Sequence, residues 1–213
     1  MRPTERSIRS HELLTDTDLG RLAELAAACH GRLAASRPEW TAELLAACLV
    51  QGGARHRVHG DRGIKDLDVY LFYATPGGRN AGHCPWNRSV WTEDFGPSAH
   101  GRNLYADAER AKPSIAQRLP RWEAFAGRRV DLLARVIAPH PDGPRAAVRT
   151  WLARGAARPR HRGPLQAMPS DWHLARCPVV ALEPDRGAVW WVGPGADEAF
   201  LERRASSESP LPR

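Results

Sequence analysis

The sequence predicts an α/β (α+β) fold: a small sheet flanked by helices, with a long loop insertion and a C-terminal hairpin. Three patterns favour this class. Residues 15–36 carry apolar side chains at helical spacing, residues 66–74 alternate with a period of two, and a second strand pattern covers 130–137. Since 213 residues with 42% hydrophobic content suffice for one compact core, we expect a single domain over residues 1–213.

The first predicted element is an amphipathic helix that follows the capping side chains of Thr15 to Asp18. Its apolar positions, from Leu19 to Leu33, recur at three- and four-residue spacing. After a break at Pro38, the stretch "EWTAELLAACLVQGG" begins with a helix-like pattern and ends in a short buried strand, predicted over residues 47–51. The sequence does not specify where one pattern gives way to the other.

The stretch "KDLDVYLFYA" is predicted to form a central strand. Asp66, Asp68 and Tyr70 alternate with apolar residues, and beyond Asp68 both faces of the strand are apolar. A strand of this kind is covered on both faces. Its two carboxylates therefore lie on one face near its beginning, at the edge of the sheet.

Residues 75–126 are rich in Gly, Pro, Asn and Trp and are predicted to form a long irregular insertion. An insertion of this length is usually a functional loop or partly disordered, and a short helix is expected near "PSIAQRLPRWEAF". The strand at 130–137 then ends before Pro139. Residues 46–137 thus form the motif-bearing core.

The C-terminal extension, residues 140–200, is predicted to contain a helix and a hairpin. The helix corresponds to "PRAAVRTWLARGAA", and two short strands surround the turn in "CPVVALEPDRGAVWWVGPG". The polar tail, residues 204–213, is expected to be disordered.

The charge and cysteine patterns restrict the class of protein. The formal net charge is +7, carried almost entirely by arginines spread along the chain, which favours phosphate-bearing partners only weakly. The four cysteines are far apart and form no CxxC pair, so neither a zinc ribbon nor a redox motif is expected. No signal-peptide pattern or membrane-length apolar run is present, and we expect a cytoplasmic protein without a membrane partner.

The Asp-Leu-Asp triplet is the first chemical signal. Alternation places Asp66 and Asp68 roughly 6 to 7 Å apart on one face of a strand. Two anions this close repel each other, whereas a divalent cation such as Mg²⁺ would keep both ionised and use their oxygens as ligands. By itself, however, an Asp-x-Asp pair is more often an ordinary surface feature than a metal site.

Two further features favour a site. Gly52 and Gly53 close an apolar strand, and glycines there let backbone N–H groups approach phosphate oxygens at the start of a helix. Asp131 lies inside the second strong strand, in "RRVDLLARVI", where a charge is unfavourable unless it is paired or binds a metal. We therefore expect Asp131 on a neighbouring strand, with its carboxylate facing those of Asp66 and Asp68.

In "LVQGG", "KDLDVYLF" and "RRVDLL" the chain resembles the nucleotidyltransferase superfamily that includes DNA polymerase beta and the minimal nucleotidyltransferases. The resemblance implies a small mixed sheet, with Mg²⁺ held on an NTP by Asp66 and Asp68 and a second Mg²⁺ bound with the help of Asp131. It further implies that Gly52 and Gly53 hold the β and γ phosphates. A nucleoside monophosphate would be transferred to a hydroxyl acceptor with release of pyrophosphate.

Several choices stay open at this level. Lys65, Arg55 and Arg57 are candidates for neutralising the triphosphate. The acceptor, whether a small molecule, an RNA end or a protein, is not specified, nor are the base preference and the oligomeric state. The alternative function is a non-catalytic regulator that binds a nucleotide or nucleic acid, in the manner of an antitoxin, and keeps the fold. His56 and His59 lack further ligands for a zinc site and are expected to be polar loop residues.

Overall fold

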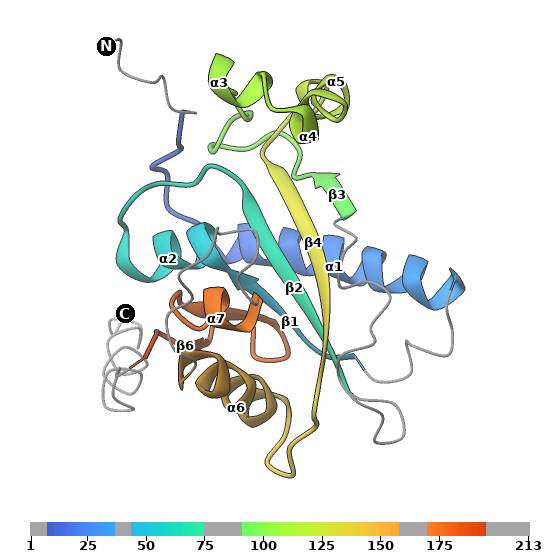
Figure 1. Cartoon of the computed structure of the whole chain (residues 1–213), viewed down its shortest axis with the longest axis vertical. Coiled ribbons are helices and arrows are strands. Elements are labelled where there is room, and N and C mark those ends of the chain that lie inside the picture. Colours follow the sequence, from blue (N-terminus) through green and yellow to red (C-terminus); the bar gives the residue numbers. More distant parts are fainter. Residues whose placement is uncertain (1–7, 37–43, 75–90, 158–169, 195–213) are drawn as a thin grey trace, which may run out of the picture.

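The computed structural model describes residues 8–36, 44–74, 91–157 and 170–194, which form a mixed sheet flanked by helices (Figure 1). The sheet has six strands in the order β3-β4-β2-β1-β5-β6. The β2–β4 pair is parallel, and the other neighbouring pairs are antiparallel. The strands are β1 (Leu44–Val50), β2 (Leu67–Ala74), β3 (Trp91–Asp94), β4 (Arg129–Ile137), β5 (Val179–Glu183) and β6 (Val189–Trp191). The predicted α/β (α+β) class is confirmed.

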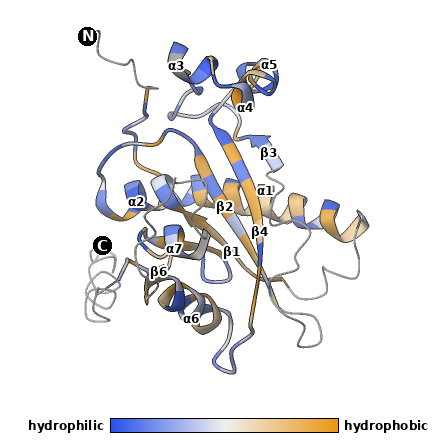
Figure 2. Ribbon diagram, viewed as in Figure 1, coloured by the Kyte–Doolittle hydropathy of each residue, from blue (hydrophilic) through white to orange (hydrophobic). Residues whose placement is uncertain are grey.

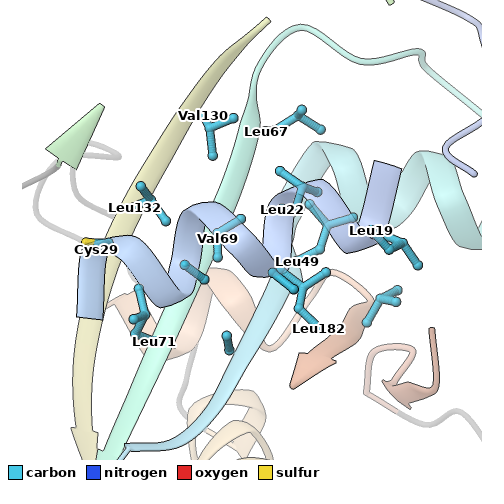
Figure 3. Close-up of a cluster of buried hydrophobic side chains, with 14 of the residues drawn as sticks. Leu19, Leu22, Cys29, Leu49, Leu67, Val69, Leu71, Val130, Leu132 and Leu182 are labelled. Carbon is cyan, nitrogen blue, oxygen red and sulfur yellow. The ribbon is translucent and has the colours of Figure 1, made fainter. Parts of the chain in front are cut away.

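Helix α1 (Asp16–Ser36) covers one face of the sheet, as its apolar stripe predicts. Figure 3 shows its side chains against those of the central strands. Leu19, Leu22 and Cys29 of α1 belong to the same buried cluster as Val69 of β2 and Leu132 of β4. The alternation of β2 and β4 provides this continuous apolar surface, because every second residue of a strand points to the same side.

The opposite face is covered by α6 (Pro144–Ala157), together with α7 (Ser170–Leu174). Phe72 of β2 is fully buried there and meets the ring of Trp151 edge-on, with the ring centroids 5.6 Å apart. Leu152 of α6 and Trp190 of β6 complete this second core. Because both faces of β2 are covered, its predicted central position is confirmed, and so are the predicted C-terminal helix and hairpin.

Three short helices lie beyond one end of β4, next to β3 (Figure 1). They are α3 (Asp107–Arg110), α4 (Pro113–Ala116) and α5 (Leu119–Glu123), and their small core consists of Tyr105, Leu119 and Trp122. Figure 2 shows that hydrophilic residues are frequent in these helices, whereas hydrophobic residues predominate along β2 and β4. The single short helix expected near residues 113–125 is in fact two helices, α4 and α5, joined by a turn.

Asp94 fixes the corner between β3 and β4. Its carboxylate accepts hydrogen bonds from the backbone N–H groups of Gly96 (2.9 Å), Ala126 (2.7 Å) and Gly127 (2.8 Å). A Cβ atom on Gly127 would lie 1.8 Å from the carbonyl oxygen of Gly96, so only glycine fits this close backbone approach. This corner sets the position of β3 and of α5 relative to β4.

Some predicted boundaries differ from the observed ones. The strand predicted over residues 47–51 is β1, which begins earlier and ends at Val50 because α2 (Gln51–His59) starts immediately after it. Residues 39–43, which begin the helix-like pattern, lie outside the described residues, as do residues 75–90 of the predicted insertion and the tail at 204–213. Among the described helices, none combines the length and apolar character that a membrane crossing requires.

Candidate functional site

A row of paired residues crosses the sheet at the end where the predicted carboxylates lie. Asp68 of β2 is the register partner of Asp131 of β4. On the outer side Thr92 of β3 pairs with Asp131, and on the inner side Val50 of β1 pairs with Asp68. The prediction that Asp131 lies on a strand next to the one that carries Asp68 is confirmed, and paired residues of adjacent strands point to the same face.

Arg129, the first residue of β4, joins the other two carboxylates. Its guanidinium lies 2.5 Å from Oδ2 of Asp66 and 3.0 Å from Oδ2 of Asp131. The opposite side of the guanidinium stacks over the ring of Trp122 at 4.2 Å, and the Arg129 side chain is only 10% exposed. Thr92 donates a hydrogen bond to Oδ1 of Asp131 at 3.2 Å. Asp66 and Asp131 are thus held in place by one buried cation.

Asp68 has no such partner. No hydrogen bond or ion pair to its carboxylate occurs within the described part of the chain. Burial raises the pKa of Asp68 well above its ordinary value, and the charges of Asp66 and Asp131 raise it further, although Arg129 and Lys65 oppose them. Burial likewise raises the pKa of Asp131, against the opposing effect of Arg129. The charged form of Asp68 is therefore disfavoured by burial and by its two neighbouring carboxylates, and Arg129 and Lys65 offset this only in part.

The first turn of α2 begins beside the carboxylates. Because Val50 is opposite Asp68 and also precedes α2, the helix starts next to that carboxylate. No side chain caps this helix start, so its first N–H groups remain available to an anion. Gly53 is needed for packing, since a Cβ there would lie 2.9 Å from a methyl group of Leu49, whereas a Cβ on Gly52 would meet nothing within 4 Å.

The other predicted cations already have partners. Lys65 donates to Glu109 at 2.7 Å. Arg55 forms a two-pronged ion pair with Asp61, and Arg57 lies 3.3 Å from Asp16. Of these three, Lys65 acts electrostatically on Asp68, because its charge opposes the rise in the pKa of that carboxyl.

His56 and His59 were expected in a loop, and this expectation is wrong, because both lie in helix α2. His56 is the buried one of the two. Its side chain is buried in the helix, with Nε2 3.1 Å from the carbonyl oxygen of Glu12 and Nδ1 3.3 Å from that of Asp61. These contacts give His56 a structural role.

The residues of the site suit Mg²⁺ in their chemistry. Across the described ranges, no three His, Cys, Asp or Glu side chains are already arranged as a metal cluster. The guanidinium of Arg129 lies between two of the three carboxylates. The donors are nevertheless carboxylate oxygens, the hard ligands that Mg²⁺ prefers. Among the described residues Asp68 has no cation as a partner, so its oxygens are available to a metal ion. Asp66, Asp68 and Asp131 are the residues that would hold the ion.

No protein-family model, curated protein or solved structure matches the chain significantly. The resemblance to the nucleotidyltransferases therefore rests on the sequence motifs.

Sequence reasoning missed two contributors to the site. Arg129 stands two residues before Asp131, so strand alternation places it on the same face, and this signal was present in "RRVDLL". Thr92 lies in a four-residue strand within the Gly- and Pro-rich insertion, where nothing in the local pattern predicts it.

Proposed function

We propose that the protein is a metal-dependent nucleotidyltransferase that transfers a nucleoside monophosphate from an NTP to a hydroxyl acceptor in the cytoplasm. The observation that carries the proposal is the direct pairing of Asp68 with Asp131 on parallel strands, beside the uncapped start of α2. Three neighbouring carboxylates and a helix N-terminus that begins beside them can bind a cation and a polyphosphate together.

Each residue of the site has its own role in this proposal. Asp66 and Asp68 would hold Mg²⁺ on the triphosphate, and Asp131 would help hold a second Mg²⁺ near the acceptor. When bound, the two ions stabilise the attacking and leaving oxygens of an in-line displacement. The N–H groups of Gly52 and Gly53, at the start of α2, bind phosphate oxygens, and Lys65 adds positive charge beside Asp66.

Arg129 favours a second candidate function. Its guanidinium already bridges Asp66 and Asp131, and its stacking on Trp122 holds it there. A protein in which this arginine permanently replaces a metal ion would bind a nucleotide or nucleic acid without catalysis, as a regulator. In the enzyme, by contrast, a cation that enters between Asp66 and Asp131 competes with the guanidinium.

Nucleotide titrations with and without Mg²⁺ distinguish the two candidates. For the enzyme, binding of a fluorescent NTP analogue requires Mg²⁺ and is lost in Asp68→Asn, and labelled NTPs release pyrophosphate once an acceptor is supplied. Binding that is indifferent to both Mg²⁺ and Asp68→Asn would contradict the enzyme and support the regulator. A matched control is Asp107→Asn, which removes an exposed carboxylate of α3 outside the site.

A further inference from the structure

A cleft of about 380 Å³ adjoins the third carboxylate of the site. One wall is β3, and the other is α5 with the two residues that precede it. The lining residues are Trp91, Thr92, Glu93, Gln117, Arg118, Arg121 and Trp122. Thr92 belongs to both features, because it lines the cleft and donates a hydrogen bond to Asp131. A molecule in this cleft therefore lies next to the carboxylate assigned to the acceptor side.

The cleft carries an excess of positive charge. Arg118 is exposed and has no ion pair or side-chain hydrogen bond among the described residues. Its charge partly opposes the rise that burial causes in the pKa of Asp131. Arg121 donates to the backbone oxygen of Thr92 at 2.9 Å, which fixes its guanidinium at the cleft wall. The carboxylate of Glu93 is neutralised by Arg32 at 2.6 Å. Two guanidinium groups thus line the cleft, and neither has a carboxylate partner among the residues that the structure describes.

The size and the polar groups of the cleft indicate its ligand. A volume of this order matches a small molecule, at the lower end of the range for ligand pockets. A pair of arginines recognises the planar or tetrahedral oxygens of a carboxylate or phosphate, and the amide of Gln117 adds a neutral hydrogen-bonding group. Trp122 is nearly buried and stacks on Arg129, so it offers little free aromatic surface.

We propose that this cleft binds the acceptor, and that the acceptor is a small molecule which carries an oxyanion, a phosphate or a carboxylate, held by Arg118 and Arg121. The inference rests on the proposed function for the role of the ligand. The binding of an anion in the cleft, however, can be measured without any nucleotide.

The test follows the side-chain N–H signals of ¹⁵N-labelled arginine by NMR while inorganic phosphate or acetate is added to the whole chain. We expect saturable shifts of the Arg118 and Arg121 signals, and binding about 5- to 10-fold weaker in Arg118→Gln, as the loss of a charge-assisted hydrogen bond predicts. Arg154→Gln on α6 removes an exposed arginine elsewhere and is expected to bind like the wild type. Tighter binding of phosphate than of acetate would assign a phosphorylated acceptor, and the reverse order a carboxylic acid.

A single-stranded oligonucleotide is titrated in the same way as a third probe. Three results would overturn the proposal: no saturable shift with either anion, equal weakening of anion binding in Arg118→Gln and Arg154→Gln, or saturation by the oligonucleotide alone. The failure of the proposed function is recognised separately. If Mg²⁺-dependent NTP binding is absent while phosphate still binds at Arg118, the nucleotidyltransferase assignment fails and the cleft remains an anion site. If NTP binding is intact and no anion binds at Arg118, only the acceptor proposal fails.

Discussion

Replacing Asp68 by Asn should make the metal-free protein more stable. Asp68 is directly opposite Asp131 and close to Asp66, and no cation pairs with it among the described residues. Two charges about 5 Å apart interact by ~3 kcal/mol at an effective dielectric constant of about 20. Burial is the largest cause of the raised pKa of Asp68 and adds to this cost, whereas Arg129 and Lys65 offset part of the repulsion. We therefore expect Asp68→Asn to raise the free energy of unfolding by ~1 to 2 kcal/mol, or the Tm by about 2 to 8 °C.

The assay is thermal and urea unfolding at neutral pH in EDTA, repeated with excess Mg²⁺. Mg²⁺ should stabilise the wild type, because a ligand that binds only the folded state adds to the free energy of unfolding, and it should leave Asp68→Asn unchanged. Asp107→Asn, which changes an exposed carboxylate, should stay within ~0.5 kcal/mol of the wild type. If Asp68→Asn proves less stable than the wild type in EDTA, the carboxylates do not repel each other, and the reasoning about the site fails.

Three further predictions concern the surroundings of the site. Arg129→Gln should destabilise the metal-free protein yet increase its stabilisation by Mg²⁺, measured by the same unfolding assay; equal stabilisation would contradict competition with the guanidinium. Asp94→Asn should cost ~1 to 3 kcal/mol at pH 7. Because its backbone hydrogen bonds outweigh burial and lower the pKa of Asp94 below 3.8, this difference should disappear as the pH falls through that lowered pKa; a constant difference would refute it. Gly127→Ala should cost at least ~2 kcal/mol in urea unfolding, whereas Gly31→Ala, with open space around its Cβ, should not destabilise.

The central part of the fold could be predicted because its patterns are local and strong. The alternation of β2 continues over eight residues with both faces apolar, and the stripe of α1 repeats over 21 residues. The position of Asp131 beside Asp68 could be predicted because a charge inside a strongly apolar strand is unfavourable unless it is paired or binds a metal ion.

The surroundings of the carboxylates could not be predicted in the same way. β3 has only four residues, and its position depends on the contacts of Asp94 and on the close approach of Gly127 to Gly96, all of which are tertiary. The ion pair of Arg129 with Asp66 spans 63 positions in the chain and depends on the parallel pairing of two strands. The cleft at Arg118 exists only because α5 packs beside β3, so no local pattern contains it.

The binding of ATP, GTP, CTP and UTP at equilibrium, with Mg²⁺ or with EDTA, tests the central claim most directly. Calorimetric titration of the wild type and of Asp68→Asn, with Asp107→Asn as the control, measures it without knowledge of the acceptor. The account predicts that at least one NTP binds the wild type and Asp107→Asn in Mg²⁺, and that its affinity falls at least about 10-fold, or ~1.4 kcal/mol, in EDTA or in Asp68→Asn. Affinity that is unchanged in EDTA and in Asp68→Asn, or the absence of binding by all four nucleotides, would contradict it.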